Sequence, residues 1–225
     1  MKLYSYDHCP YCVKARMIFG LKNIPIEVKT LLNDDEETPI SMIGKKMLPI
    51  LQKENGDFLP ESIDIISYCD QLSKFGEPIV GESKNDERLT SWLSQARNYH
   101  YALAMPRWVK MGLKEFATES AIEYFTKKKV NSIGPFKESM DKTSELIEMA
   151  QEHLPELEEI IIGAPYFWGE SLSIDDFHVF ASLRCLTTTN GIRFPEKIEK
   201  YMNSLSQSSK VPLHWDKAVG VVSYE

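Results

Sequence analysis

The sequence predicts an α/β domain followed by an all-α domain, on two observations. Residues 1–75 switch between the period-two spacing of strands and the longer period of helices, in the order βαβαββα. After the stretch SKFGEPIVGESKNDER, which is rich in Gly, Pro and charge, hairpin signals disappear and amphipathic helical patterns follow. We therefore expect an α/β domain over 1–75, a linker over 76–88 and a helical domain over 89–225.

Local patterns predict each element of the first domain. Alternating polarity predicts a short strand in KLYSY, and helical spacing predicts a helix in PYCVKARMIFGLKN. A second strand is expected in IPIEVKTL and a short helix in DDEETPISMIG. A hairpin is expected in LPILQKENGDFLP, turning at Asn55 and Gly56, before a third helix in ESIDIISYCDQL. Both strand–helix–strand steps predict parallel pairing, and the hairpin adds an antiparallel edge to a four-stranded mixed sheet.

The second domain shows only helical patterns. They occur in RLTSWLSQARNYHYALAMP, IEYFTKKK, the 136–162 region, IDDFHVFASLRCLTTTN and PEKIEKYMNSLSQS. Pro155 should kink or break the third of these helices. In LSIDDF, Ser173 and Asp176 have the spacing of a capping box, flanked by Leu172 and Phe177 as a hydrophobic staple. This pattern predicts a helix start with a buried first turn.

Composition and charge exclude several classes of protein. The chain has 225 residues, 43% of them hydrophobic, and a net charge of −7. An acidic chain is unlike a general nucleic-acid binder, which usually has a basic surface. The longest mostly apolar run, IIIGAPYFW, is far shorter than the roughly 20 residues that span a bilayer, and MKLYSYDHCPYC has no apolar core of a secretion signal. We expect a cytoplasmic protein that binds neither nucleic acid nor membrane.

Two of the four cysteines are paired by spacing. Cys9 and Cys12 flank Pro10 and Tyr11, whereas Cys69 and Cys185 lie in apolar helical patterns and are expected to be buried. Cys9 falls at the predicted helix N-terminus, where unpaired N–H groups and the helix dipole favour a thiolate. Cys12 lies one turn inside the helix. The pattern predicts Cys9 as a nucleophile and Cys12 as a resolving thiol.

A zinc site is the alternative interpretation of this cysteine pair. It needs two more ligands, and the chain has no second C-x-x-C and no H-x₃₋₅-H pair. His8 adjoins Cys9 but is expected to be an exposed loop residue rather than a ligand, so we expect no metal. Lys14 and Arg16 either favour the thiolate and an anionic substrate or are ordinary solvated helix residues.

Two further patterns admit a structural and a functional interpretation. Pro49 stands where the third strand should begin, either as a turn proline or as a cis-proline that leaves the backbone of Leu48 free to pair with an extended peptide. Glu61 and Ser62 open a helix. They either cap it or help its N–H groups to bind a carboxylate or amino group of a small peptide.

Taken in order, YDHCPYC, LPI and ESIDI resemble the glutaredoxins of the thioredoxin superfamily. C-P-Y-C is the glutaredoxin form of the redox motif, whereas thioredoxins and disulfide isomerases usually carry Gly after the first Cys. The helical second half extends the likeness to the bacterial two-domain glutaredoxins, which are built like glutathione S-transferases, and SIDDF is similar to the capping motif of their helical domain. The resemblance implies a thioredoxin-like βαβαββα domain followed by a helical domain of the glutathione S-transferase kind.

The resemblance also implies a glutathione site. Cys9 would form the mixed disulfide with glutathione, and Tyr11 would line the groove. Leu48, before a cis-proline, would pair with the glutathione cysteine through its backbone. Many family members have Val at this position, but only the backbone is needed. Glu61 and Ser62 would hold the γ-glutamyl end.

The implied activity is glutathione-dependent thiol–disulfide exchange on glutathionylated or disulfide-containing proteins. Glutathione would be a co-substrate recycled by a separate reductase, so no nicotinamide cofactor should bind, and the two-domain glutaredoxins imply a monomer. The alternatives are a glutathione transferase acting on electrophiles, or a non-catalytic binding protein with a vestigial site. Most transferases place Tyr or Ser where this chain has Cys9, and the intact C-P-Y-C argues against both alternatives.

Overall fold

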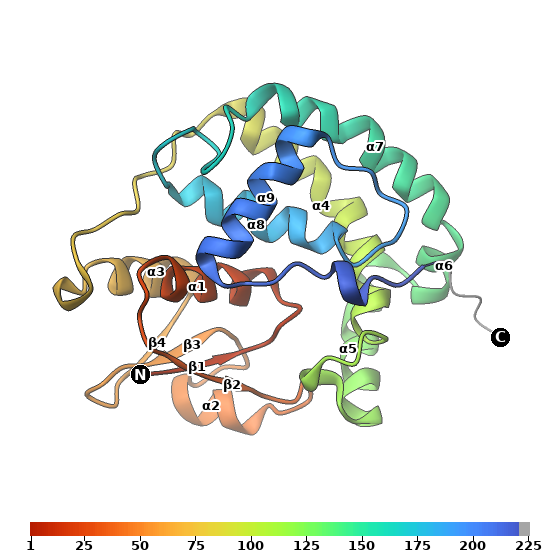
Figure 1. The fold of residues 1–225 in the computed structure, drawn as a ribbon. Helices are drawn as coiled ribbons and strands as arrows, with labels where there is room; N and C mark the ends of the chain where they lie inside the picture. Colours follow the sequence, from red (N-terminus) through yellow and green to blue (C-terminus); the bar gives the residue numbers. More distant parts are fainter. Residues whose placement is uncertain (221–225) are drawn as a thin grey trace.

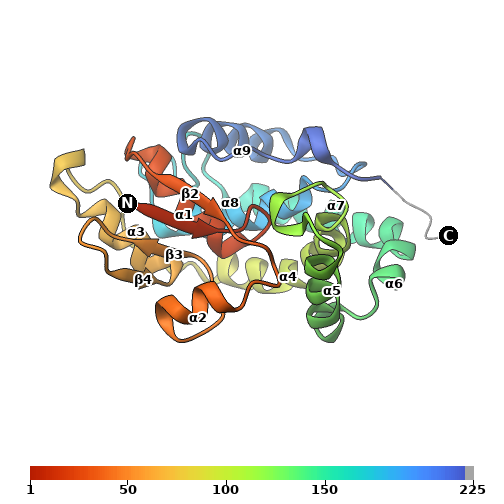
Figure 2. The same cartoon turned by 90° about the horizontal axis from the view of Figure 1, so that it is seen from below.

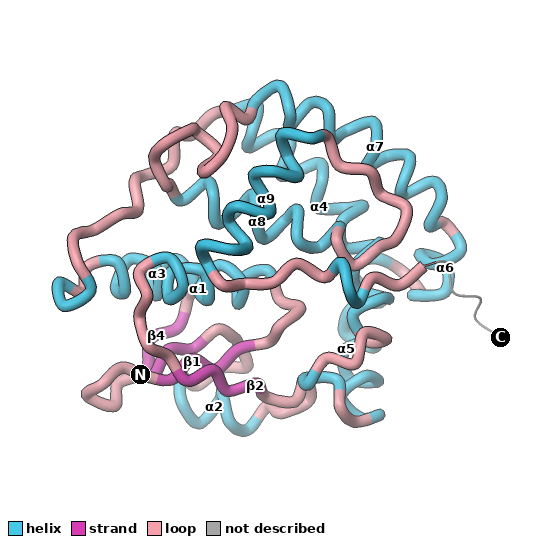
Figure 3. Tube along the Cα trace, viewed as in Figure 1, coloured by secondary structure: helices cyan, strands magenta, loops and turns pink. Residues whose placement is uncertain are grey.

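The computed structural model describes residues 1–220, so the last five residues of the predicted helical domain lie outside the described residues. The first domain has the expected order of strands and helices: β1 (Lys2–Ser5), α1 (Pro10–Leu21), β2 (Glu27–Thr30), α2 (Glu37–Ile43), β3 (Ile50–Gln52), β4 (Phe58–Pro60) and α3 (Ser62–Asp70). All the strands of the sheet lie at one end of the molecule (Figure 3).

The second domain is helical, as the sequence predicts. Its elements are α4 (Glu87–Trp108), α5 (Glu119–Ile133), α6 (Phe136–Asp141), α7 (Thr143–Ile160), α8 (Ile174–Leu186) and α9 (Glu196–Ser209), with short 3₁₀ turns η1 (Ser73–Phe75), η2 (Lys114–Phe116) and η3 (Trp215–Lys217). Within residues 1–220, none of these helices combines the length and the apolar character needed to cross a membrane.

The sheet is mixed, with strand order β2-β1-β3-β4. β1 is parallel to β2 but antiparallel to β3, which in turn is antiparallel to β4. Parallel pairing is therefore confirmed for the first strand–helix–strand step and wrong for the second. Thr30 ends β2 opposite Ser5, and Ile50 begins β3 opposite Tyr4, at the same edge. The seven residues of α2 rise only about 10 Å, so the chain re-enters the sheet from the edge that it left.

The helices form layers around the sheet. α1 and α3 cover the face toward the helical domain, and α2 covers the other face (Figure 1). α1 connects the two domains, because it packs against α3 beside it and against α8 and α9 of the helical domain. One continuous core joins the two domains, and it includes Leu3, Met17, Ile18, Trp92, Phe177 and Phe180.

Two local predictions in the helical domain have different outcomes. The capping box is present, with the Ser173 N–H donating to Asp176 Oδ2 at 2.8 Å. Pro155 does not break the helix, because α7 runs through this residue, and the alternative of a kink there stays a prediction. Leu154 and Leu157 beside it are fully buried, and their packing offsets the lost backbone hydrogen bond. The helical stretch is instead interrupted at Lys142, where α6 ends and α7 begins.

Candidate active site

The two paired cysteines lie at the start of α1, at the carboxyl edge of β1. Cys9 is the N-cap residue, its carbonyl accepts from the Val13 N–H at 2.9 Å, and Pro10 occupies the first turn. The Cys9 side chain is partly exposed, whereas Cys12 is fully buried. Both are free thiols here. The first turn of α1 therefore leaves the Cys9 sulfur accessible and buries the Cys12 sulfur.

The two thiols differ in ionisation. The hydrogen bond from the Cys12 side chain lowers the pKa of Cys9 to about 6, against the effect of burial and with help from the His8 charge and the N–H groups of Cys12 and Tyr11. Burial raises the pKa of Cys12 well above its ordinary value, and the hydrogen bond that Cys12 donates to Cys9 raises it further. The pair therefore holds one thiolate and one protonated thiol near neutral pH.

Lys14 and Arg16 are both less solvated than ordinary helix residues. Lys14 is buried, and its Nζ lies 4.5 Å from the ring centre of Tyr11 and 3.4 Å from His178 Nδ1. Burial lowers the pKa of Lys14, although the Cys9 charge acts to raise it. Arg16 is held in an ion pair with Asp7. Of these two cations, Lys14 is therefore the one with an electrostatic interaction with Cys9.

The loop before β3 meets the cysteine pair. The Leu48–Pro49 peptide bond is cis. Leu48 and Cys12 belong to one small buried cluster, against which Cys9 packs. None of the residues in 1–220 forms a backbone hydrogen bond with Leu48. This proximity depends on the antiparallel direction of β3, which starts at the cysteine edge.

Glu61 and Ser62 lie where α3 starts. Glu61 has a φ of 67°, in the left-handed region, and its side chain makes no capping hydrogen bond. Its carboxylate lies 3.7 Å from Lys45 on the surface, while Ser62 is buried. The Glu61 carboxylate interacts electrostatically with Lys14, so the start of α3 lies near the first turns of α1. Simple side-chain capping by Glu61 is thus not its role in this structure.

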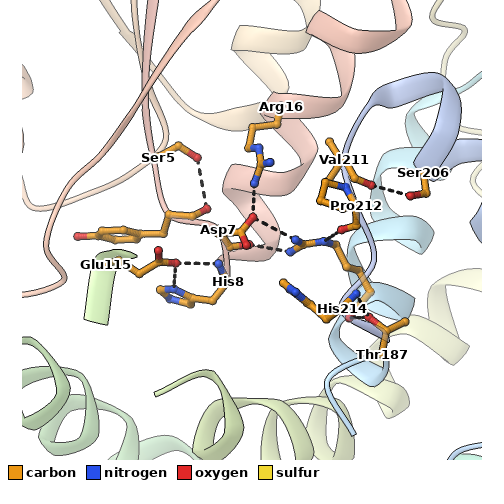
Figure 4. Close-up of polar contacts among 12 residues, drawn as sticks. Ser5, Asp7, His8, Arg16, Glu115, Thr187, Ser206, Val211, Pro212 and His214 are labelled. Atoms are coloured by element: carbon orange, nitrogen blue, oxygen red, sulfur yellow. Dashed lines mark hydrogen bonds and ion pairs between the residues drawn. The ribbon is translucent and has the colours of Figure 1, made fainter. Parts of the chain in front are cut away.

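His8 differs from expectation, because it is buried rather than exposed. Its side chain is 6% exposed and lies among the rings of Tyr6, Trp108, Phe116 and Phe125. Its backbone N–H donates to Glu115 Oε1 at 2.9 Å, and its Nδ1 lies 2.8 Å from the same oxygen (Figure 4). The reason is tertiary, since η2 and α5 of the helical domain cover the loop. No sequence signal connects Glu115 with a residue 107 positions away.

The helical domain also binds the residue before His8. Arg184 on α8 donates to the Asp7 carbonyl at 2.7 Å and to Asp7 Oδ1 at 3.1 Å. Although burial acts to raise it, the pKa of Asp7 is held well below its ordinary value by Arg184 and Arg16. Figure 4 shows Asp7 between Arg16 and the segment that carries Pro212. Two side chains of the helical domain therefore bind the loop before Cys9: Glu115 binds His8, and Arg184 binds Asp7.

A cavity of about 550 Å³ opens between Cys9 and the helical domain. Its lining includes Cys9 and Tyr11 on one side and Arg97, Tyr101, Trp108 and Lys129 on the other. Its volume is ordinary for a small-molecule site. Glu61, Ser62 and Leu48 are not part of this lining, so the cavity and the predicted glutathione site meet only at Cys9 and Tyr11.

The remaining cysteines are buried, as predicted. Burial raises the pKa of both Cys69 and Cys185 to about 12, which leaves them protonated. Within the described part of the chain, no three His, Cys, Asp or Glu side chains form a group that could hold a metal ion.

The domain family described as "Glutaredoxin 2, C terminal domain" matches residues 88–218. Glutaredoxin 2 of Escherichia coli (strain K12) is 42% identical over 213 residues, which cover 95% of this chain and 97% of that protein. The chain belongs to the glutaredoxin 2 family. The family described as "Glutathione S-transferase, N-terminal domain" matches residues 3–78.

Solved structures agree with this membership. Glutaredoxin 2 of Salmonella typhimurium, crystallised in complex with glutathione, has a TM-score of 0.91 and 43% identity, over 97% of this chain and 98% of that one. A glutathione S-transferase of Ceriporiopsis subvermispora has a TM-score of 0.68 at 15% identity, over 93% and 96%, and shares the fold alone. The predicted two-domain fold and the assignment as a glutaredoxin enzyme are therefore confirmed.

Proposed function

We propose that the protein reduces protein–glutathione mixed disulfides and protein disulfides, with Cys9 as nucleophile, Cys12 as resolving thiol and glutathione as co-substrate. The supporting observation is that the two thiols ionise differently. Cys9 is partly exposed and has a pKa of about 6, whereas Cys12 beside it is buried and protonated. A thiolate at neutral pH attacks disulfides without a general base.

On a glutathionylated protein, Cys9 Sγ attacks the glutathione sulfur. A disulfide forms between Cys9 and glutathione, and the bond to the protein sulfur breaks. That sulfur leaves with the electron pair and takes a proton from water. A second glutathione thiolate then attacks the bound glutathionyl sulfur, which releases glutathione disulfide and restores the Cys9 thiolate. Cys12 takes no covalent part in this cycle.

On a protein disulfide, Cys9 forms a mixed disulfide with the protein, and Cys12 resolves it. Cys12 must first lose its proton. Once Cys9 is bonded to the substrate, its negative charge is gone, and with it one cause of the raised pKa of Cys12. Cys12 then attacks Cys9 Sγ, the reduced protein leaves, and two glutathione molecules reduce the Cys9–Cys12 disulfide.

The proposed glutathione site lies on the side of Cys9 toward α3. Leu48, before the cis Pro49, offers an unpaired backbone for the cysteine of glutathione, as in edge-strand recognition. Ser62 and the exposed Glu61 at the start of α3 would hold the γ-glutamyl end, and the exposed ring of Tyr11 would line the groove. The glutathione complex of the Salmonella relative supports this proposal.

The wider setting is part of the same proposal. The partners are glutathione and glutathionylated or disulfide-containing proteins, and the enzyme acts as a monomer in the cytoplasm, where thiols are kept reduced. No nicotinamide is bound, since a separate reductase recycles glutathione. The proposed boundaries are 1–75 for the redox domain, 76–88 for the linker and 89–225 for the helical domain.

The first experiment is a coupled assay with glutathione, a glutathione mixed disulfide, glutathione reductase and NADPH, run beside Cys9→Ser. We expect turnover by the unmodified protein and none above background by Cys9→Ser, because the attacking sulfur is gone. Equal turnover by the two would disprove the role of Cys9. No turnover by the folded, reduced protein would favour the transferase alternative, which a panel of electrophiles would then test.

A further inference from the structure

Glu115 of the helical domain is a fully buried carboxylate held by a single residue. Its exposed fraction is 0%, and its Oε1 accepts from both the backbone N–H and Nδ1 of His8. Its other oxygen, Oε2, has no hydrogen-bond partner in the described structure. Within residues 1–220, the only ion pair of Glu115 is the one with His8. This carboxylate therefore has one source of compensating charge.

A buried carboxylate is stable only when a neighbouring charge or several hydrogen bonds compensate it. Burial acts to raise the pKa of Glu115, but the hydrogen bonds and charge of His8 outweigh it and lower that pKa below its ordinary value. The ionised carboxylate in turn favours the protonated imidazole. Aromatic rings stabilise a cation through their faces, and the ring of Tyr6 stacks on His8 with the ring centres 5.3 Å apart.

No other ionisable group near His8 takes the place of the ion pair between His8 and Glu115 within the described residues. The Asp7 carboxylate is neutralised by Arg16 and Arg184. Burial raises the pKa of Tyr6 far above the working range, so this phenol stays neutral. Lys129 lies over the ring of Phe125 and lines the same cavity as His8, and no ion pair joins it to Glu115 within residues 1–220. Glu115 and the Cys9 thiolate are the negative charges that favour the cation.

We propose that Glu115 is a positioning residue for the redox reaction: it keeps His8 cationic directly before Cys9, so that the helical domain favours the Cys9 thiolate. The inference rests on the proposed function, because it assumes that Cys9 is the attacking thiol. It assigns the helical domain an electrostatic task in addition to burying one face of the redox domain. An imidazolium next to a cysteine favours the thiolate in the same way as other nearby cations.

The decisive variant is Glu115→Gln, which keeps the shape and an accepting oxygen but removes the charge. The thiolate absorbance at 240 nm, followed against pH, gives the ionisation midpoint of Cys9, since Cys69 and Cys185 titrate near 12. We expect the midpoint to rise by about one pH unit. Glu123→Gln is the matched control, because it removes the same charge from an exposed site on α5 and should leave the midpoint unchanged.

Kinetics provide a signature that a loss of structure would not produce. With the midpoint moved from about 6 to about 7, kcat/KM for a glutathione mixed disulfide should fall about fivefold at pH 6 and hardly at all at pH 8.5. An equal loss at both pH values would indicate a structural role and overturn the proposal. An unchanged midpoint in folded Glu115→Gln would overturn it too, while wild-type turnover would leave the proposed function standing.

A measurement on the unmodified protein covers the case in which Glu115→Gln does not fold. ¹⁵N-labelled histidine distinguishes imidazolium from neutral rings by NMR. Burial lowers the pKa of the other four histidines: to about 3 for His100 and His214, to about 4 for His178, and below its ordinary value for His153. These four rings are therefore neutral at pH 7. We expect one cationic histidine at pH 7. Five neutral rings would overturn the proposal without any variant.

Discussion

At the scale of single residues, a hydrogen bond between two sulfurs distinguishes the ionisation of Cys9 from that of Cys12. Cys12 donates to Cys9, and this bond is the largest cause of the low pKa of Cys9. The donor is fully buried, so water cannot take its place. Cys12 therefore has two separable tasks: it stabilises the Cys9 thiolate, and in the proposed mechanism it resolves mixed disulfides with proteins.

Two substitutions of Cys12 separate these tasks. Cys12→Ser keeps a donor, whereas Cys12→Ala removes it, so we expect the Cys9 ionisation midpoint to be about one pH unit higher in the Ala variant than in the Ser variant. Both should retain transfer from glutathionylated substrates at pH 8.5 and lose the reduction of protein disulfides. The 240 nm titration and the coupled assay measure these effects. Equal midpoints would show that another group lowers the pKa of Cys9.

At the scale of elements, α1 is the helix that both domains share. It carries the cysteines at one end and packs against α9 near the other, where Gly20 meets the last residue of α9. A Cβ built on Gly20 would lie 1.8 Å from the Ser209 carbonyl oxygen. The two backbones are therefore closer than any larger residue permits. In Figure 1, α9 lies on the side of α1 away from the sheet, and in the view from below it runs along one border of the molecule (Figure 2).

Gly20→Ala should consequently destabilise the protein. A backbone carbonyl cannot move aside as a flexible side chain does, so α1 and α9 must separate, at a cost of about 2 kcal/mol or more in the free energy of unfolding. Urea denaturation measures this change. Asn203→Ala, at an exposed position on α9, is the control and should stay within about 0.5 kcal/mol of the unmodified protein. Equal stability of Gly20→Ala would contradict the close approach of the two helices.

At the scale of the whole molecule, several buried histidines couple stability to pH. His100 and His214 are 1% and 2% exposed, and burial lowers both pKa values to about 3. The unfolded chain binds these protons near pH 6.5, whereas the folded chain does not bind them until about pH 3. Between these values the unfolded state holds more protons, so the folded state loses stability as the pH falls.

The free energy of unfolding should therefore decrease between pH 6 and pH 5 by about 1.2 kcal/mol for each of these two residues. Burial raises the pKa of Asp176, which acts in the opposite sense and makes the observed decrease smaller. Urea denaturation at the two pH values measures the difference. His214→Asn should reduce the pH dependence, whatever its effect on stability at pH 7. A free energy of unfolding that does not change with pH would show that these rings are protonated in the folded state.

Local sequence determined the elements and the place of the cysteines. The order βαβαββα, the helix start at Cys9 and the capping box at Ser173 each depend on residues within a few positions, because strand period, helix period and capping act over that range. The capping residues and the C-P-Y-C stretch could thus be identified without any tertiary information. The likeness to two-domain glutaredoxins came from the same short motifs.

Tertiary structure decided what surrounds those cysteines. The direction of β3, which brings Leu48 to the cysteine pair, follows from where the chain re-enters the sheet. The burial of His8 and its contact with Glu115 arise because the helical domain covers the loop before Cys9. Sequence patterns carry no information about such pairs, since contacts between residues 107 positions apart depend on how whole elements pack. In the proposal above, those distant contacts add to the local hydrogen bond from Cys12 in favouring the Cys9 thiolate.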